Sequence, residues 1–150
     1  MKKKVLSAAL GICVLTLLAG ATGYAQLTGA PFRINIPFDF TVRGKTLPAG
    51  DYEIKRIYDE TDSLEISNVH RSHEHALFET EPVEARKIPN HAELLFHRYG
   101  NEYFLSEIWS PGIQTGRELP VSRQEKAVKQ ETAKNNNGQS EVQTVAVAIQ

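Results

Sequence analysis

Three histidines lie close together in the segment His70-Arg71-Ser72-His73-Glu74-His75. Neutral imidazoles bind zinc, copper and nickel, and a strand would bring His73 and His75 to one face, with His70 closing over them from the preceding turn. A further ligand could come from one of three later residues: Glu79, Glu81 or His97. The segment therefore predicts either a zinc or copper site or a solvated loop, and the positive charge of Arg71 favours the loop.

A second candidate is one face of a hairpin predicted near the middle of the chain. Two apolar strands, Ala92–Tyr99 and Tyr103–Trp109, are joined at Gly100, and glycine in the first turn position favours a type II′ turn. The resulting register puts Ile108 on one face. The opposite face carries four residues that could stack on a sugar ring or bind a peptide: Arg98, Tyr103, Glu107 and Trp109. In the alternative, structural interpretation, the two charged residues pair at the rim of the core and the two rings fill it.

The residues before the hairpin alternate as strands do. From Phe32 to Val42 every even-numbered residue is apolar, which predicts one strand with a buried face, and Pro37 predicts an edge or a bulge within it. Further strands are predicted around three short apolar patterns: Tyr52–Ile57, Leu64–Val69 and Ala76–Thr80. Residues 82–89, between two prolines, are predicted to cross the surface.

The C-terminal segment predicts one helix. Ser122 followed by Glu125 is a capping box, so we expect a helix from about Arg123 to Ala133, packed on the sheet through Ala127 and Val128. Residues 135–140 have the composition of a linker, and residues 142–149 fit either a terminal strand or a loose tail. The fold class predicted is mainly β: a single antiparallel β-sandwich or a small open barrel with one short C-terminal helix.

The first 25 residues predict an export signal. Lysines follow Met1, an apolar run extends from Val5 to Leu18, and small residues lead up to Ala25. These are the three parts of a secretory signal peptide, and cleavage would leave Gln26 first in the mature chain. The apolar run is shorter than the roughly 20 residues that span a bilayer, which disfavours the alternative of an uncleaved anchor. We therefore expect a periplasmic or extracellular protein without a transmembrane segment after cleavage.

Cleavage would also change the charge and remove all sulfur. The signal holds three lysines, no acidic residue and the only Met and Cys, so the net charge moves from −1 to −4. A negative mature chain argues against nucleic-acid binding, and the loss of Cys13 excludes thiol chemistry and disulfides. The domain organisation predicted is a signal peptide at 1–25, a β-domain with its helix at 26–134, and a flexible tail at 135–150 that can end in a short strand.

Three stretches of the sequence stand out together: IPFDFTV at 36–42, GKTLPAGDY at 44–52, and a block from LFHRYG at 95–100 through YFLSEIW at 103–109 to GRELP at 116–120. They resemble a group of small exported bacterial proteins that has no known reaction or ligand. The resemblance covers about Phe32 to Lys129. It implies export and a compact β-domain, and no particular chemistry.

Motifs of the common enzyme classes are missing from the sequence. It contains no Gly-x-Ser-x-Gly, no phosphate-binding glycine loop and no dinucleotide fingerprint. We therefore predict a non-catalytic binding or structural protein of the cell envelope, with an envelope protein or a polysaccharide as its partner. The alternative is a periplasmic metal-binding protein that uses His70, His73 and His75.

Overall fold

The computed structural model describes residues 31–57, 62–135 and 142–149. The predicted signal peptide and most of the predicted linker lie outside these ranges. The elements follow one another along the chain as β1 (Phe32–Ile36), β2 (Phe40–Val42), β3 (Lys45–Leu47), β4 (Gly50–Arg56), β5 (Ser63–Asn68), β6 (His75–Glu79), β7 (Glu81–Glu84), β8 (Glu93–Tyr99), β9 (Glu102–Trp109), β10 (Thr115–Glu118), α1 (Arg123–Asn135) and β11 (Gln143–Ala148).

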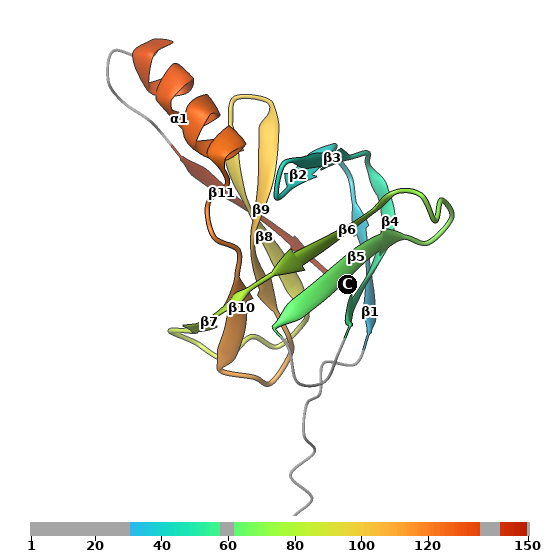
Figure 1. The fold of residues 1–150 in the computed structure, drawn as a ribbon. Coiled ribbons are helices and arrows are strands. Elements are labelled where there is room, and N and C mark those ends of the chain that lie inside the picture. The colour runs from blue at the N-terminus through green and yellow to red at the C-terminus, as the bar shows by residue number, and fades with distance from the viewer. Residues whose placement is uncertain (1–30, 58–61, 136–141, 150) are drawn as a thin grey trace, which may run out of the picture.

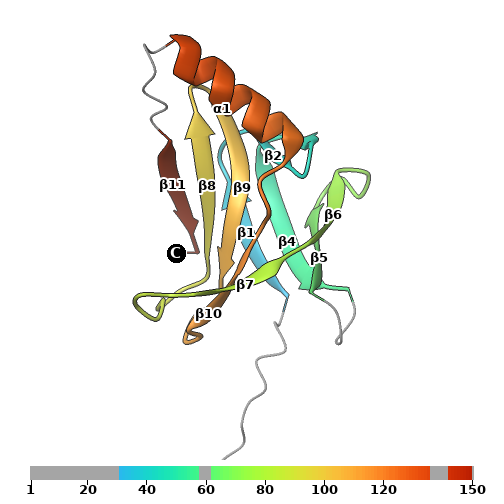
Figure 2. The same cartoon turned by 60° about the vertical axis from the view of Figure 1, so that its left-hand side comes forward.

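Two β-sheets pack against each other, so the chain is a β-sandwich, as the sequence predicts (Figures 1 and 2). The first sheet has the strand order β1-β4-β5-β6, and the second has the order β11-β8-β9-β10-β7. The short β2–β3 hairpin joins the second sheet through β9. The pairings between described strands are antiparallel except for β2 with β9, where Thr41 pairs with Phe104.

The alternating pattern from Phe32 to Val42 forms two strands in different sheets rather than one. β1 pairs with β4 in the first sheet, whereas β2 pairs with β3 and β9 in the second. The chain changes sheets at Pro37, which has no amide hydrogen to continue a ladder, and Asp39 accepts a 2.8 Å hydrogen bond from the amide of Ala49. The predicted buried face is correct, because its members enter the core from both strands: Ile34, Ile36, Phe40 and Val42.

The core lies between the two sheets, and Phe40 of β2 joins their aromatic residues. Its ring meets Tyr52 of β4 edge to face, with 5.1 Å between the centroids, and Phe96 of β8 at 5.6 Å. The Tyr52 hydroxyl donates a 2.6 Å hydrogen bond to the carbonyl of Pro48. This side chain therefore fills the core without leaving its polar atom unsatisfied.

The β8–β9 hairpin has the turn that the sequence predicts. Tyr99 pairs with Glu102 across a two-residue turn. Gly100 has a positive φ of 62°, whereas the φ of Asn101 is not positive. This combination fits a type II′ turn. The turn fixes the register of the outer part of the hairpin, where Arg98 pairs with Tyr103.

A β-bulge then inverts the predicted alternation. Leu95 pairs with Glu107 and Phe96 with Leu105, which leaves Ser106 of β9 as an extra residue. Beyond the bulge Ile108 is part of the core cluster. The prediction that Arg98, Tyr103, Glu107 and Trp109 share one face is therefore wrong: the last two lie on the side opposite the first two.

The segment after β6 contains two strands that the sequence analysis did not predict. β7 occupies the start of the segment expected only to cross the surface, and β10 follows the loop at Pro111 and Gly112. β7 is the edge strand of the second sheet, which is where Pro82 is tolerated within a strand. β10 lies between β9 and β7, so it brings its own side chains to the interior of the sandwich.

Helix α1 lies at the end of the sandwich where the β8–β9 turn is found (Figure 2). It begins at Arg123, as predicted, and the amide of Glu125 donates to Ser122 Oγ at 3.1 Å. The predicted packing through Ala127 is wrong: Ala127 is exposed, Val128 is half-buried, and the buried residue of the helix is Glu125. Among the described residues, no helix is long and apolar enough to cross a membrane.

Strand β11 resolves the alternatives for the end of the chain in favour of a terminal strand. It pairs antiparallel with β8 from Gln143 to Ala148, and the amide of Ile149 donates to the carbonyl of Ala92. Strand β11 is thus part of the second sheet.

Candidate functional site

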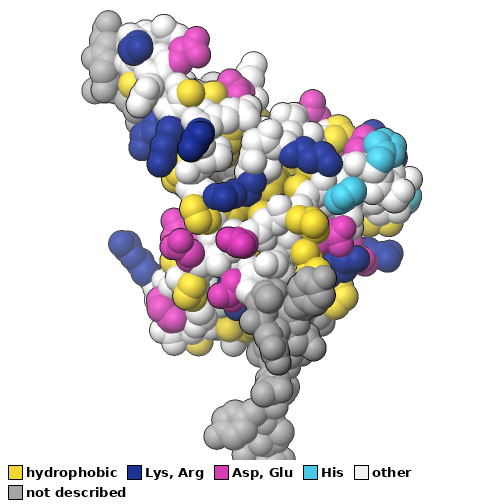
Figure 3. All heavy atoms as spheres, in the orientation of Figure 1, with side chains coloured by type: hydrophobic (Ala, Val, Ile, Leu, Met, Phe, Trp, Pro, Cys, Tyr) yellow, Lys and Arg dark blue, Asp and Glu magenta, His cyan; other side chains and the backbone are white. Residues whose placement is uncertain are grey.

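The three histidines lie at the connection between β5 and β6, on an exposed part of the surface (Figure 3, cyan). Their rings face three different groups: His70 Nε2 is 3.5 Å from Asp51 Oδ2, His73 Nε2 is 3.8 Å from Glu74 Oε1, and His75 Nδ1 is 2.9 Å from the carbonyl of Ser72. In the part of the chain that the structure describes, no three His, Cys, Asp or Glu residues form a group that could hold a metal ion. Zinc or copper binding here stays a prediction, and it requires the loop to rearrange.

Arg98 and Tyr103 lie at the turn end of the hairpin and are held by contacts within the protein. Arg98 Nε donates to the carbonyl of Gly100 at 2.7 Å, and its guanidinium carbon lies 5.4 Å from the centre of the Tyr103 ring. The same ring stacks on Phe38, with 3.9 Å between centroids. The predicted pairing of Arg98 with Glu107 does not occur, because the bulge turns Glu107 to the other side of the sheet.

Trp109 packs on the outer side of the second sheet. Its indole N–H donates to Glu107 Oε2 at 2.8 Å, and only 7% of the residue is exposed. The ring lies against Gly116 of β10, where an added Cβ atom would come within 2.4 Å of Trp109 Cε3. A ring packed in this way has no free face on which a sugar or a peptide could stack.

Glu125 anchors the helix to the second sheet. In a capping box the glutamate side chain returns to the start of its own helix. Here Oε1 of Glu125 lies 2.7 Å from His97 Nδ1 and accepts a 3.2 Å hydrogen bond from the Tyr99 hydroxyl. Burial, together with the neighbouring carboxylate, raises the pKa of Tyr99 to about 12, so this hydroxyl remains a donor. Oε1 of the buried carboxylate therefore has two partners on the second sheet, and its role is structural.

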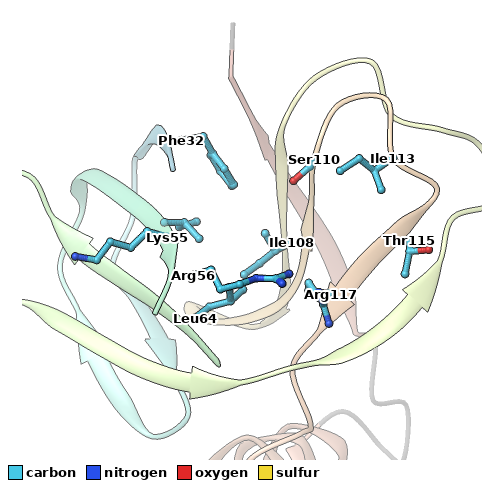
Figure 4. A pocket seen from close by; sticks show the side chains of 10 residues that line it. Phe32, Lys55, Arg56, Leu64, Ile108, Ser110, Ile113, Thr115 and Arg117 are labelled. Carbon is cyan, nitrogen blue, oxygen red and sulfur yellow. The ribbon is translucent and has the colours of Figure 1, made fainter. Parts of the chain in front are cut away.

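A pocket of about 200 Å³ opens between the two sheets, at the end of the sandwich away from α1 (Figure 4). It is formed where β4 and β9 end and where β5 and β10 begin. Half of its lining residues are apolar, contributed by both sheets and by the β9–β10 loop: Phe32, Ile54, Leu64, Ile108 and Ile113. The side chain of Arg56 extends across the pocket toward Arg117, and the Ser110 hydroxyl lies on the far side of the pocket.

The polar groups that line the pocket differ in how they are paired. Arg117 Nη1 forms an ion pair with Asp62, the Lys55 ammonium lies 2.9 Å from Glu65, and Thr115 Oγ1 donates to Glu84 at 2.7 Å. Arg56 has no such partner: its Nε is buried, and no described residue accepts a hydrogen bond from it. A buried charged donor without an acceptor costs free energy, and such groups are rare in folded proteins.

The sequence holds a signal for these two arginines that our predictions missed. Arg56 continues the period of two that begins with the buried Tyr52 and Ile54, so it must face the interior. Arg117 shares its parity with the buried Leu119, but the strand that carries it was not predicted. The two residues come from different sheets, and only the packing of the sandwich brings them to one pocket.

Comparisons of this chain with protein-family models, with curated proteins and with solved structures found no match. The assignment of a role therefore depends on the geometry of the site.

Proposed function

We propose that this protein is an exported, non-catalytic binding protein of the cell envelope and that its binding site is the pocket between the two sheets. One observation carries the proposal: the buried, unpartnered Nε of Arg56 in a pocket with apolar walls. Small-molecule sites typically combine apolar walls with a few converging polar groups. Export is supported by the signal-peptide pattern of residues 1–25.

Binding is favoured over catalysis by the side chains that line the pocket. A nucleophile needs a base within hydrogen-bond reach, and acid–base catalysis needs a group that exchanges protons near neutral pH. The lining includes the hydroxyl of Ser110, but the described lining residues include no histidine, carboxylate or thiol beside it. A guanidinium donates hydrogen bonds and accepts none, so Arg56 and Arg117 can hold a ligand but offer no general base.

Binding can be tested with 2-phenylethanol, a neutral ligand with one ring, followed through the methyl NMR signals of the purified protein. We expect the largest shifts at the aliphatic residues of the walls: Ile54, Leu64, Ile108 and Ile113. Ile113→Trp, which fills the pocket, should abolish the shifts, whereas Ile88→Trp, at an exposed position outside the pocket, should leave them unchanged. Small shifts spread over the whole surface, or none at all, would refute a binding pocket.

Export can be tested by expressing the full chain in a Gram-negative host and measuring the mass of the protein in the periplasmic fraction. We expect a chain that begins at Gln26. Replacing Ala25 with Leu should block processing, because the cleavage site requires a small residue. Accumulation of the unprocessed wild-type chain in the cytoplasm would contradict export while leaving the pocket unaffected.

A further inference from the structure

The inward position of Arg56 and Arg117 is not the usual protection of a sheet edge. Inward-pointing charges on edge strands discourage pairing with other chains. β4, which carries Arg56, lies between β1 and β5, and β10, which carries Arg117, lies between β9 and β7. Both strands are therefore internal to their sheets, so protection of a sheet edge does not explain why these two charged side chains face the interior.

The positive charge of this pocket is only partly balanced. The carboxylates of Asp62 and Glu65 form ion pairs with Arg117 and Lys55. Arg56 forms no ion pair or hydrogen bond with the described residues, and its Nε is shielded from solvent. The guanidinium lines the pocket, so a ligand that supplies one negative charge there would balance its charge.

The kind of anion follows from the geometry of the donor. The planar fork of a guanidinium matches two oxygens of a carboxylate or of a phosphate, but inorganic phosphate or a phosphate monoester carries more negative charge than one guanidinium balances. With Arg117 already engaged by Asp62, one guanidinium is left for the ligand. Arg56 is thus suited to a monocarboxylate.

The size of the ligand follows from the volume and the walls. A cavity of about 150 Å³ lined by apolar side chains holds one benzene ring. This pocket has about 200 Å³, which is enough for one ring and a short acidic group. In Figure 4 the apolar side chains of Phe32, Ile108 and Ile113 lie above the two arginines, so the ring and the carboxylate would have separate places.

We propose that the pocket binds a small monocarboxylate whose apolar body has the size of one aromatic ring, with its carboxylate on Arg56 and its ring among the apolar walls. This inference rests on the proposed function, because it names the ligand class for the same pocket. It is separable from that function, since the pocket could bind neutral ligands equally well.

The test compares phenylacetate with 2-phenylethanol, which has the same ring and a hydroxyl in place of the carboxylate, by titration of the purified protein. We expect phenylacetate to bind at least tenfold more tightly. Arg56→Met should remove that advantage, so that the two compounds bind with equal affinity, and Arg56→Lys, which keeps the charge but loses the fork, should keep part of it. Arg33→Met is the matched control, because Arg33 is an exposed arginine outside this pocket that pairs with Glu53.

The outcomes separate the two proposals. Equal affinity for the two compounds, or a phenylacetate affinity that Arg56→Met does not change, would overturn the carboxylate proposal and leave the binding pocket standing. Binding of inorganic phosphate more tightly than phenylacetate would also overturn it, in favour of a different anion. Failure of both aromatic compounds to bind would overturn the proposed function together with the ligand class.

Discussion

A charged side chain faces inward at each end of the sandwich, and the two side chains differ in the hydrogen bonds that they make. At the helix end, the carboxylate of Glu125 meets His97 at 2.7 Å and the Tyr99 hydroxyl at 3.2 Å. At the pocket end, Arg56 has a buried Nε without an acceptor among the described residues. The first charge is satisfied by the fold itself, whereas the second is not.

This difference separates a structural role from a binding role. A buried charge that is fully hydrogen-bonded holds its neighbours in place, and removing it leaves orphaned partners. The guanidinium of Arg56 has no acceptor among the described residues, and the proposed ligand would supply one. The comparison predicts that substitutions at the two ends have opposite effects on the free energy of unfolding.

The largest effect is expected at the helix end. Glu125→Ala would leave His97 and Tyr99 without their shared acceptor and would detach the start of α1. Because hydrogen bonds to a charged group contribute about 1.5–3 kcal/mol each, we expect a loss of about 3 kcal/mol in the free energy of unfolding, measured in urea. Gln124→Ala, at the exposed neighbouring position, should cost less than about 0.5 kcal/mol. Equal effects of the two substitutions would show that the cluster does not anchor the helix.

A somewhat smaller loss in the free energy of unfolding is expected for a substitution where β10 lies against β9. Gly116→Ala would put a Cβ atom within 2.4 Å of the Trp109 ring, so strand β10 must shift. Overpacking of this kind costs about 1–3 kcal/mol. Trp109→Phe removes part of the ring system that the new Cβ would meet, so the double variant should lose less than the sum of the two single losses. Strict additivity would contradict the close packing described for this pair.

Alkaline pH should weaken the helix end. The pKa of Tyr99 is raised to about 12 in the folded protein, whereas an unfolded tyrosine titrates near 10. The unfolded chain therefore releases its proton first, and stability that is present below pH 10 is lost as the pH rises toward 12. We expect a loss of about 2 kcal/mol over this range, from the 1.36 kcal/mol that corresponds to each pKa unit.

Tyr99→Phe provides the control for that pH dependence. The variant lacks the titrating hydroxyl, so its stability should fall less steeply between pH 10 and pH 12 than that of the wild type. Part of the slope should remain, because burial also raises the pKa of Tyr52. An unchanged slope in the variant would show that Tyr99 is not the group responsible.

The sequence predicts the local features of this fold better than its long-range ones. Alternation identifies the buried face of the segment that contains Ile34 and Phe40, and a capping box marks the start of α1, because both signals depend on near neighbours. The change of sheet at Pro37 and the bulge at Ser106 depend on which strands meet in space. The bulge alone separates Glu107 and Trp109 from Arg98 and Tyr103.

The pocket could not be predicted from the sequence for the same reason. Histidines and aromatic residues were predicted as site residues because of their chemistry, but Trp109 is packed against Gly116 and the three histidines face separate groups. Arg56 and Arg117 look like ordinary strand residues in the sequence. Their parity with buried neighbours indicates that they face inward, and only the packing of the two sheets shows that they line one pocket.

The most direct test of the account is the free energy of unfolding of Arg56→Met in urea without any ligand. Methionine keeps much of the side-chain volume and removes the unpaired guanidinium. We expect a stability equal to the wild type or higher by up to about 1 kcal/mol, because the guanidinium makes no hydrogen bond or ion pair with the described residues that would be lost. A loss of more than about 1 kcal/mol would mean that Arg56 holds the fold together, and would contradict the claim that its charge is kept for a ligand.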